Sequence, residues 1–549
     1  MPAEEAHQLP TGKRVVSRPT LRSIKVNGNI IKLLGGICVE AKAVRQSKLI
    51  YWASGIVSIC GIIFEVLFGA LGSYILGDGV KQYTLTISLF LTGMGIGASI
   101  SERIMKDLIT AFVRVEFAVA LIGGFSSFLM FGITAFAPEG SEALFLYTVT
   151  FSIGALTGVE LPILIRKANE IGVELNRSTA RVLFSDYAGG LIGGLLFAFY
   201  LRPQMGMVKS AFIVGVINLS VALLVLWLFR KEISYLKIHM VSGVLIGLLL
   251  IAGVLFGEEM AFSFEQKLYK DPIIHMEDTA YQRIVLTKEQ GDTRLYLNGA
   301  LQFSSSDEYR YHETLVHPAM AKASSTKNVL LLGGGDGLAV REILKYKEVE
   351  SVTVVDLDPR MTELAQTNFH LLQLNEDALS DERVNILNRD AFKYLEQTDE
   401  MYDVVIVDLP DPNNESLNKL YTWEFYSLIR NHLNSEGAIM VQATSPVFAR
   451  SVYWTISETI ASTGLHTKNL HIDVPSFGNW GYVLASRTPT SMEQLAIKPP
   501  TRYLTQDMLE ALTVFGKDED KDIEGVELKP NTLIDPHLIE KYEQAWKNY

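Results

Sequence analysis

The stretch Leu330-Leu331-Leu332-Gly333-Gly334-Gly335-Asp336-Gly337 governs the architecture of the second half of this 549-residue chain. Its leucines predict a buried strand, its glycines a tight turn, and the residues from Leu338 a helix. This order brings the backbone N–H groups of the turn, which begins at Gly333, close to a nucleoside ligand. The acid in the turn, Asp336, would repel a phosphate or carboxylate and hold an ammonium group. The stretch therefore predicts a cationic nucleoside ligand rather than a dinucleotide.

The residues after this turn predict a parallel sheet. Short apolar segments alternate with segments of helical pattern, and the expected strands are 329–332, 351–356, 384–387, 404–408 and 438–442. Strands that alternate with helices form right-handed βαβ units. We therefore expect an α/β Rossmann-like domain of the methyltransferase type, with a parallel sheet, over residues 326–490.

Acidic residues follow the expected strands at their carboxyl ends, where parallel sheets bind ligands. Asp356, about 20 residues beyond the glycine turn, is placed to accept hydrogen bonds from ribose hydroxyls, and the alternative is a helix N-cap. Asp390 is placed either to meet an adenine amino group or to cap a helix. Asp358 stands before Pro359 and predicts an N-cap with proline in the first helical turn.

The segment Asp408-Leu409-Pro410-Asp411-Pro412 follows the fourth expected strand. Two carboxylates so close together on a proline-stiffened loop repel each other and favour a cation between them. A solvated turn is the alternative. An amine with a pKa near that of lysine, ~10.4, is protonated at neutral pH, and a carboxylate that accepts its proton turns it into a nucleophile.

Composition narrows the function classes. The formal charge of −12 at pH 7 argues against nucleic acid as the main ligand and suits a cationic substrate. The two cysteines, Cys38 and Cys60, cannot build a disulfide framework, and neither belongs to a cluster of metal-ligand residues. We therefore expect no metal site.

The first half of the chain is apolar. Residues 46–257 contain seven segments near the ~20 residues that a helix needs to cross a bilayer. These segments are 48–70, 84–101, 112–136, 143–165, 183–201, 208–229 and 239–256. We therefore expect a multi-span α-helical domain in the lipid bilayer of the cell membrane.

Basic residues bear on the orientation of this domain. Residues 1–45 form a basic tail, and further Lys and Arg fall in the second, fourth and sixth loops, which favours a cytoplasmic N-terminus. Seven spans would then leave residues 258–549 outside the cell, whereas a domain that uses a cytosolic nucleoside must face the cytoplasm. We expect the cytoplasmic placement, which requires a re-entrant segment or an outside N-terminus.

Four acids lie within the apolar segments: Glu65, Glu116, Glu160 and Asp186. Ionisable groups in a bilayer are costly and are functional candidates for that reason. One interpretation is a cation or polyamine site between helices. The alternative is hydrogen bonding between helices, or acids near the membrane interface.

Residues 258–325 form a linker and a small β-rich region. The alternating apolar residues of 281–286 and 293–297, on either side of a Glu289–Asp292 turn, predict a hairpin. Residues 491–549 form a polar C-terminal tail that ends in a predicted helix over 538–549.

Several of these motifs together resemble the spermidine synthase (polyamine aminopropyltransferase) family. The matching segments are Tyr281-Gln282, Gly299–Gln302, Asp307–Glu313, Gly333–Gly337, Asp356–Asp358, Asp390-Ala391, Asp408–Pro412 and Gly478–Gly481. Their order and spacing agree over about residues 278–490. The apolar half is similar to the N-terminal part of membrane-anchored bacterial members.

The resemblance implies transfer of an aminopropyl group from decarboxylated S-adenosylmethionine to putrescine or a related amine, giving spermidine and methylthioadenosine with no further cofactor. It implies nucleoside binding by Gln282, Asp356, Asp390 and Ala391. It implies a polyamine and aminopropyl site that contains Gln302, Tyr311, His312 and Asp336. Asp408 would accept the proton, and Asp411 would hold the charge of the acceptor amine. A homodimer is expected because many soluble relatives associate.

The chain departs from the family pattern at a few positions. Asp356 stands where the family usually has glutamate, and Phe477 where a tyrosine often contacts the polyamine. Leu409-Pro410 and Asn413–Glu415 also differ, which bears on the acceptor more than on the reaction class.

Two alternative functions are an S-adenosylmethionine-dependent methyltransferase, which Asp336 would serve poorly, and a polyamine transporter or sensor with a nucleoside-binding domain.

Overall fold

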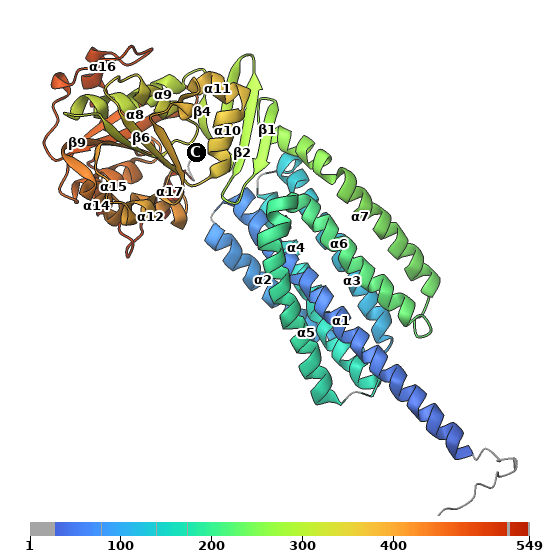
Figure 1. Cartoon of the computed structure of the whole chain (residues 1–549). Coiled ribbons are helices and arrows are strands. Elements are labelled where there is room, and N and C mark those ends of the chain that lie inside the picture. The colour runs from blue at the N-terminus through green and yellow to red at the C-terminus, as the bar shows by residue number, and fades with distance from the viewer. Residues whose placement is uncertain (1–27, 78, 139, 173, 524–526, 547–549) are drawn as a thin grey trace, which may run out of the picture.

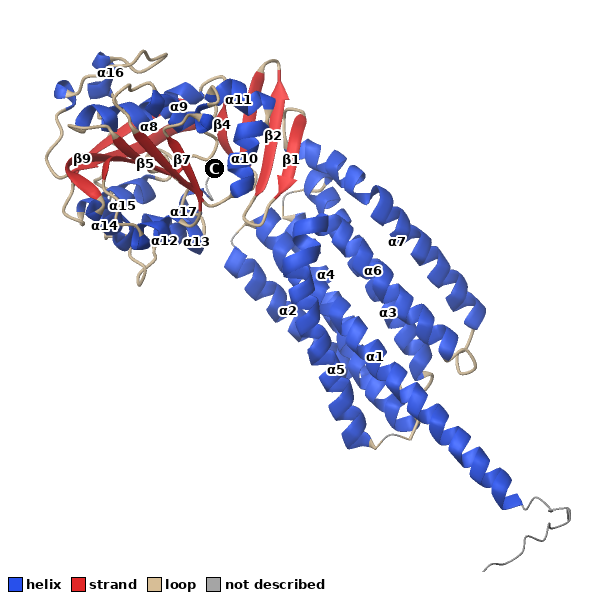
Figure 2. Cartoon of the chain, viewed as in Figure 1, coloured by secondary structure: helices blue, strands red, loops and turns tan. Residues whose placement is uncertain are grey.

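The computed structural model describes residues 28–77, 79–138, 140–172, 174–523 and 527–546, with side chains from residue 46 onward. The predicted basic residues between 1 and 27 lie outside the described residues. The described chain has two parts, a bundle of long helices and a mixed α/β part, joined at one end of the bundle (Figures 1 and 2).

The bundle contains seven long helices within the described residues. They are α1 (Gly28–Leu76), α2 (Gly79–Ser101), α3 (Leu108–Phe136), α4 (Ser141–Glu170), α5 (Leu175–Leu196), α6 (Arg202–Leu228) and α7 (Leu236–Glu265), with a π-helical turn η1 (Phe197–Leu201) between α5 and α6. Six of the seven predicted apolar segments lie on one of these helices to within one residue, and the segment 183–201 covers the end of α5 together with η1. Helix α1 begins at Gly28, within the residues that were expected to form the tail.

By length and composition, six continuous stretches of the described residues are long and apolar enough to cross a membrane. One of them, Leu175–Leu228, is 54 residues long and is interrupted at Gly206, where φ is 64° and ψ is −179°. Its two ends lie close together, since Glu232 beyond α6 pairs with Lys167 near the end of α4 at 2.8 Å. The stretch therefore turns back at Gly206 and runs along the bundle twice.

Glycines allow the closest helix contacts in the bundle. A Cβ on Gly97 or Gly158 would lie 1.9 or 2.1 Å from a backbone oxygen of the facing helix, which joins α2 tightly to α4. A Cβ on Gly189 would lie 2.2 Å from the carbonyl oxygen of Gly55, and Gly193 approaches the Ile59 carbonyl in the same way. Small residues commonly permit such close contact between helices in membranes.

The four acids of the bundle differ in their surroundings. Glu116 and Glu160 are buried, whereas Glu65 and Asp186 are half-buried. The Asn218 Nδ2 of α6 donates to the Glu116 carboxylate of α3 at 2.9 Å. Hydrogen bonding between helices is therefore present at Glu116, and a cation site stays a prediction.

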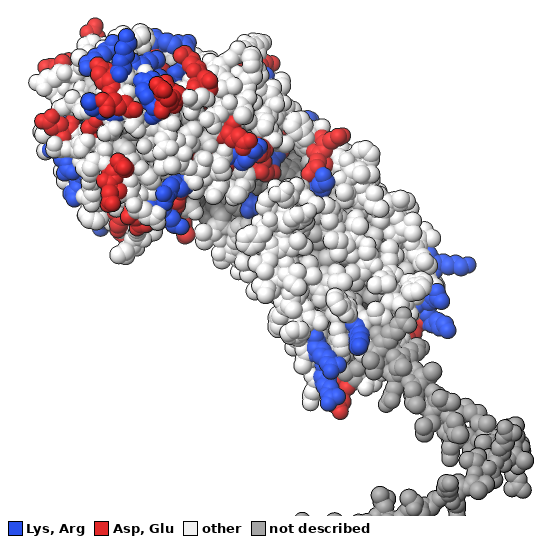
Figure 3. All heavy atoms as spheres, viewed as in Figure 1, with Lys and Arg blue, Asp and Glu red and all other residues white. Residues whose placement is uncertain are grey.

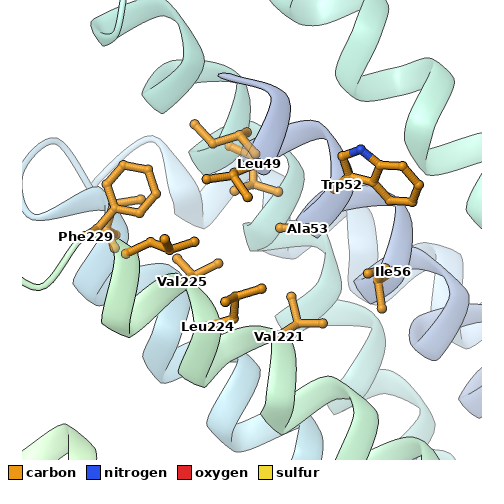
Figure 4. A pocket seen from close by; sticks show the side chains of 12 residues that line it. Leu49, Trp52, Ala53, Ile56, Val221, Leu224, Val225 and Phe229 are labelled. Carbon is orange, nitrogen blue, oxygen red and sulfur yellow. The ribbon is translucent and has the colours of Figure 1, made fainter. Parts of the chain in front are cut away.

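A pocket opens between α1 and α6 (Figure 4). Its lining is apolar and includes Leu49, Trp52, Leu224 and Phe229. Trp52 is 72% exposed, so this surface faces the surroundings of the bundle. An apolar lining suits a hydrocarbon chain and offers nothing to a cationic substrate.

The two ends of the bundle differ in charge. The start of α1 and the α/β part lie at opposite ends (Figure 1). Basic residues gather at or near the end away from the α/β part (Figure 3), and they are Arg103, Lys106, Arg166, Lys167, Arg177, Arg181, Arg230, Lys231 and Lys237. The described helices thus separate this basic end from the α/β part by the full length of the bundle.

A small antiparallel sheet follows the bundle. Its strands, in spatial order, are β1 (Ile273–Asp278), β2 (Arg283–Glu289), β3 (Asp292–Leu297) and β4 (Ala300–Ser304). The predicted hairpin is β2 and β3, which pair around the Gln290-Gly291 turn. The hairpin prediction is confirmed, and two further strands flank it.

Helix α8 (Glu308–Lys322) leads into a seven-stranded sheet of order β10-β11-β9-β8-β5-β6-β7. The strands are β5 (Asn328–Gly333), β6 (Ser351–Asp356), β7 (Val384–Asn388), β8 (Tyr402–Asp408), β9 (Leu433–Gln442), β10 (His466–Val474) and β11 (Gly478–Ser486). Strands β5 to β9 are parallel, which confirms the predicted Rossmann-like domain. The antiparallel pair β10 and β11 was not predicted.

Helices cover both faces of this sheet. Between the strands lie α9 (Leu338–Leu344), α10 (Pro359–Thr367), α11 (Phe369–Asn375), α12 (Ala391–Gln397), α13 (Glu415–Asn418), α14 (Trp423–Asn431) and α15 (Arg450–Ala461). Beyond β11 follow α16 (Gln506–Ala511) and α17 (Leu538–Trp546). The carboxyl ends of β5, β6 and β8 meet at one edge, where the predicted site residues cluster.

Candidate active site

The glycine turn after β5 is joined to the loop after β8. The Gly334 N–H donates to the carbonyl oxygen of Asp408 at 3.2 Å. Gly333 has φ +83°, and a Cβ there would lie 2.0 Å from the same oxygen. A side chain at this position would therefore be both strained and obstructed. Glycine at 333 lets the turn and the acid-bearing loop approach each other.

Asp356 closes the other side of the turn. Its carboxylate accepts hydrogen bonds from the Gly335 N–H at 3.1 Å and from the Asp358 N–H at 2.9 Å. Burial raises the pKa of Asp356 to about 6, against the lowering effect of these hydrogen bonds. The carboxylate thus lies beside the turn, where the ribose of a nucleoside was expected.

Gln282 reaches the same edge from the small sheet. Its Nε2 donates to the Asp358 carboxylate at 3.0 Å. Asp358 also accepts from the Arg360 N–H at 3.1 Å and caps α10. The N-cap prediction for Asp358 is confirmed, and the hydrogen bond to this cap joins Gln282 to the carboxyl end of β6.

Asp408 stands at the end of β8. It accepts a hydrogen bond from the Tyr311 hydroxyl at 2.7 Å. Burial and the nearby Asp336 carboxylate raise its pKa, and the positive charge of His312 and the Tyr311 hydrogen bond lower it. The balance places the pKa of Asp408 at about 6. Near pH 7 it is therefore a carboxylate that still accepts a proton readily.

His312 is a cation among these acids. Its Nδ1 lies 2.8 Å from the Glu308 carboxylate, which also pairs with the Arg341 guanidinium at 3.0 Å. Burial lowers the pKa of His312, but the hydrogen bond to Glu308 and the charges of Glu308, Asp336 and Asp408 outweigh burial and raise it to about 9. His312 therefore carries a positive charge at neutral pH.

Asp336 lies within electrostatic range of the same imidazolium. Its Oδ1 accepts from the Leu338 N–H at 2.9 Å, so it also holds the start of α9. Burial raises the pKa of Asp336, and the charge of His312 opposes that rise. Asp336 and Asp408 thus act on one histidine, and Asp356 lies close to Asp336, so acids outnumber this one cation.

Asp411 ends the same loop and has neutral donors. Thr444 Oγ1 donates to it at 2.7 Å and Gln442 Nε2 at 3.3 Å, and the Tyr542 hydroxyl lies within hydrogen-bonding reach. Burial raises the pKa of Asp411, and these donors lower it. The carboxylate is half-buried and pairs with no lysine or arginine of the described chain.

Thr444 has a strained backbone. Its φ is +60°, in the left-handed region that a β-branched residue rarely adopts. The Thr444 carbonyl accepts from the Gly481 N–H at 2.7 Å, and these contacts hold the strained conformation. Such strain concentrates at binding and catalytic sites. It aims the threonine hydroxyl at Asp411.

Three further predicted site residues have hydrogen-bond partners or positions outside this group of acids. Asp390 caps α12 through the Phe392 N–H at 2.9 Å and pairs with Lys419. Ala391 is the first residue of α12. Gln302 on β4 donates to the Ala300 carbonyl of its own strand at 3.0 Å. The cap alternative for Asp390 is therefore realised, and roles for these three residues stay predictions.

The cluster also contains residues that the sequence analysis missed. Glu308 and Arg341 set the charge of His312, and Gln442 and Tyr421 hold the loop after β8 by donating to the Leu409 carbonyl. The Trp480 Nε1 donates to Gln442 Oε1 at 3.1 Å. Only the Gly478–Gly481 motif pointed to this side of the site, because the other residues come from separate elements.

Aromatic rings pack beside this group of acids. Tyr311 packs against Phe477 and Tyr482, with ring centroids 5.9 and 5.5 Å apart. Phe477 in turn packs edge-on against Trp480 at 5.0 Å. Among the residues with described side chains, no group of three or more His, Cys, Asp or Glu is arranged to hold a metal ion. The arrangement of acids and rings suits an organic cation with a methylene chain.

The fold and this cleft define a Rossmann-like transferase for a cationic nucleoside and an amine. The family model of the spermine/spermidine synthase domain matches residues 308–495. The chain is 72% identical over 508 residues to a polyamine aminopropyltransferase of Oceanobacillus iheyensis, covering 92% of this chain and 99% of that protein. The chain belongs to the polyamine aminopropyltransferase family and transfers aminopropyl groups.

A second relative agrees with this assignment. A polyamine aminopropyltransferase of Leptospira interrogans is 42% identical over 491 residues, covering 89% of this chain and 97% of that protein. A crystal structure of spermidine synthase in complex with the transition state analogue AdoDATO matches with a TM-score of 0.42 and 24% identity, over 45% of this chain and 86% of that one. The methyltransferase and transporter alternatives are not favoured.

Proposed function

We propose that the donor is decarboxylated S-adenosylmethionine and that the acceptor is putrescine or a related amine, with Asp408 as the proton acceptor. The products are then spermidine, or its homologue, and methylthioadenosine. The observation that carries this proposal is the meeting of Asp336, Asp356 and Asp408 around the glycine turn. Both reactants are cations, and a negative cleft favours their simultaneous binding.

The donor fits the side of the cleft that Asp356 and Asp336 form. Asp356 is positioned to accept hydrogen bonds from the ribose hydroxyls, as in other nucleotide-binding α/β sheets. Asp336 would attract the aminopropyl ammonium group of the donor. It would repel the carboxylate of intact S-adenosylmethionine, so the buried acid discriminates between the two nucleosides.

The proton follows a short path in this scheme. The acceptor amine enters as an ammonium group and gives a proton to the Asp408 carboxylate as its nitrogen attacks. A carbon–nitrogen bond forms and the carbon–sulfur bond breaks, so the sulfonium becomes a neutral thioether. Asp411 would hold the charge of the acceptor amine, and Tyr311 would hold Asp408 in place through its 2.7 Å hydrogen bond.

Asp408→Asn tests the role of the proton acceptor. The asparagine keeps the shape of the side chain but cannot accept a proton, so we expect kcat to fall by about 10²–10⁴-fold. Methylthioadenosine release is measured with purified full-length protein, the decarboxylated donor and a panel of diamines and triamines. Donor binding by calorimetry is the control, because it should change little. Wild-type turnover in Asp408→Asn would refute the assignment.

We also propose that the helical bundle lies in the cell membrane and that the α/β part faces the cytoplasm, where nucleoside donors are available. The length and apolar composition of the helices support the membrane placement. The basic end of the bundle opposes the cytoplasmic placement, because Lys and Arg usually mark the cytoplasmic side. A homodimer is carried over from the family resemblance alone.

A further inference from the structure

The C-terminal segment is anchored to the core of the α/β part. The Asn531 N–H donates to Thr459 Oγ1 at 2.9 Å, and the side chain of Asn531 donates to the Tyr421 carbonyl at 3.0 Å. Leu538 is fully buried, and Lys541 Nζ donates to Thr455 Oγ1 at 2.9 Å. Helix α17 therefore has a defined position against α15, although it lies beyond the part of the chain that the family model matches.

This segment reaches the loop after β8 by two routes. The first is through Tyr421, whose carbonyl accepts from Asn531 and whose hydroxyl donates to the Leu409 and Pro410 carbonyls at 3.0 Å. The second is direct, because the Tyr542 hydroxyl of α17 lies within hydrogen-bonding reach of the Asp411 carboxylate. The C-terminal segment thus supports the loop and touches one of its acids.

Aromatic rings continue from Tyr542 toward the wall of the cleft. Tyr542 packs against Trp546 with centroids 5.9 Å apart, and Trp546 packs against Phe448 at 5.7 Å. A Cβ on Gly478 would lie 2.9 Å from the Phe448 ring, which places that ring beside the turn that carries Phe477. The rings of α17 therefore extend the aromatic wall to the Asp411 end of the cleft.

We propose that Tyr542 is a positioning residue that orients Asp411 and sets the length of the acceptor amine. This inference rests on the proposed role of Asp411. Thr444 Oγ1 donates to the carboxylate at 2.7 Å, and the Tyr542 hydroxyl lies within hydrogen-bonding reach of it. Neither group carries a charge, so together they orient Asp411 and preserve its charge for an ammonium group. The phenol ring and Trp546 stand at this end of the cleft, where the distal part of a longer amine would have to extend.

Tyr542→Phe tests the hydrogen bond with little change of shape. A hydrogen bond to a charged group contributes to binding free energy, so its loss should raise the KM for putrescine by about 10-fold. The KM for the decarboxylated donor should stay at the wild-type value. Because the Tyr542 donor favours the ionised Asp411, the acid limb of kcat/KM for putrescine should also move to higher pH.

Tyr542→Ala tests the length limit. Removal of the ring should raise the ratio of spermidine to putrescine turnover several-fold, because a longer chain then has room beyond Asp411. Gln544→Ala, an exposed position on the same helix, is the matched control and should behave as wild type. All variants are assayed as full-length protein in detergent.

The outcomes separate the two proposals. Wild-type putrescine KM and acid limb in Tyr542→Phe would overturn the inference, as would an equal rise of donor and acceptor KM, which indicates a general structural role. Asp411→Asn is measured in parallel. An unchanged putrescine KM in Asp411→Asn would overturn the proposed role of Asp411 itself. A raised KM in Asp411→Asn together with wild-type kinetics in Tyr542→Phe would overturn the role of Tyr542 alone.

Discussion

The side chains of Asp408 and His312 determine each other's charge. The imidazolium lowers the pKa of Asp408, and the carboxylates of Glu308, Asp336 and Asp408 raise that of His312 to about 9. One buried cation thus opposes the rise that burial causes in the pKa of both Asp336 and Asp408. The acids around His312 titrate as a group, so measured pKa values belong to the cluster.

This electrostatic balance predicts an acid limb in the pH–rate profile. Asp408 must be a carboxylate to accept a proton, and its pKa is about 6, so kcat/KM for the acceptor should fall about tenfold per pH unit below about 6. The rate should be independent of this group above about pH 7. Initial rates of methylthioadenosine release from pH 5 to about pH 8.5 measure the limb.

Tyr311→Phe is the matched variant for this prediction. The Tyr311 hydroxyl donates to Asp408 and lowers its pKa, so its removal should raise that pKa and move the acid limb to higher pH. A profile without a limb near pH 6, or one that is identical in the two proteins, would contradict the assignment of the limb to Asp408.

Among the secondary-structure elements, the end of α7 and strand β2 form the junction between the two parts. Arg283 of β2 pairs with Glu265 of α7 and with Asp278 of β1, and the Tyr74 hydroxyl of α1 donates to Glu265 at 2.9 Å. The exposed fractions of the Arg283 and Glu265 side chains are 9% and 3%. The junction is thus a buried ionic contact directly next to Gln282.

Arg283→Met should destabilise the protein by about 3–5 kcal/mol, because it leaves Glu265 buried without its cation. The midpoint of thermal unfolding in detergent, followed by circular dichroism, measures the loss. Lys327→Met is the control, since its ion pair with Glu350 is exposed to solvent and should contribute little to stability. Equal shifts of the two midpoints would show that the buried contact does not stabilise the junction.

For the molecule as a whole, the helical bundle separates the basic end from the catalytic part. The described long helices number seven, which is odd. The chain therefore enters the α/β part at the end of the bundle opposite its basic end. The basic end of the bundle therefore favours a catalytic part outside the cell, whereas the proposed nucleoside donor is cytosolic and favours a catalytic part inside.

Single cysteines distinguish the two orientations. Gln544→Cys marks the catalytic part and Lys231→Cys the basic end, each in a variant with Cys38 and Cys60 replaced by serine. For a cytoplasmic catalytic part, a membrane-impermeant maleimide on intact cells should label Lys231→Cys and leave Gln544→Cys unlabelled until the cells are opened. The reverse pattern would place the catalytic part outside the cell.

Much of the fold was predictable because its signals are local. Buried apolar runs, glycine turns and acids after strands identified β5 to β9 and the Asp358 cap, and apolar length identified the helices of the bundle. Strands β10 and β11 were missed, since an antiparallel pair that returns to the sheet edge has no local pattern that separates it from a loop. The polar tail after residue 490 gave no sign that Tyr542 reaches Asp411.

The amino-acid order was sufficient for the reaction class through its family resemblance, because the order and spacing of the glycine turn, the Asp408–Pro412 loop and the other motifs agree with those of the polyamine aminopropyltransferases. The charge of His312, the partner of Asp390 and the donors to Asp411 depend on contacts between residues far apart in the chain. Those contacts exist only after the sheet, the helices and the C-terminal segment have packed. A side chain's pKa and orientation follow from its neighbours in space, and the linear pattern does not contain them.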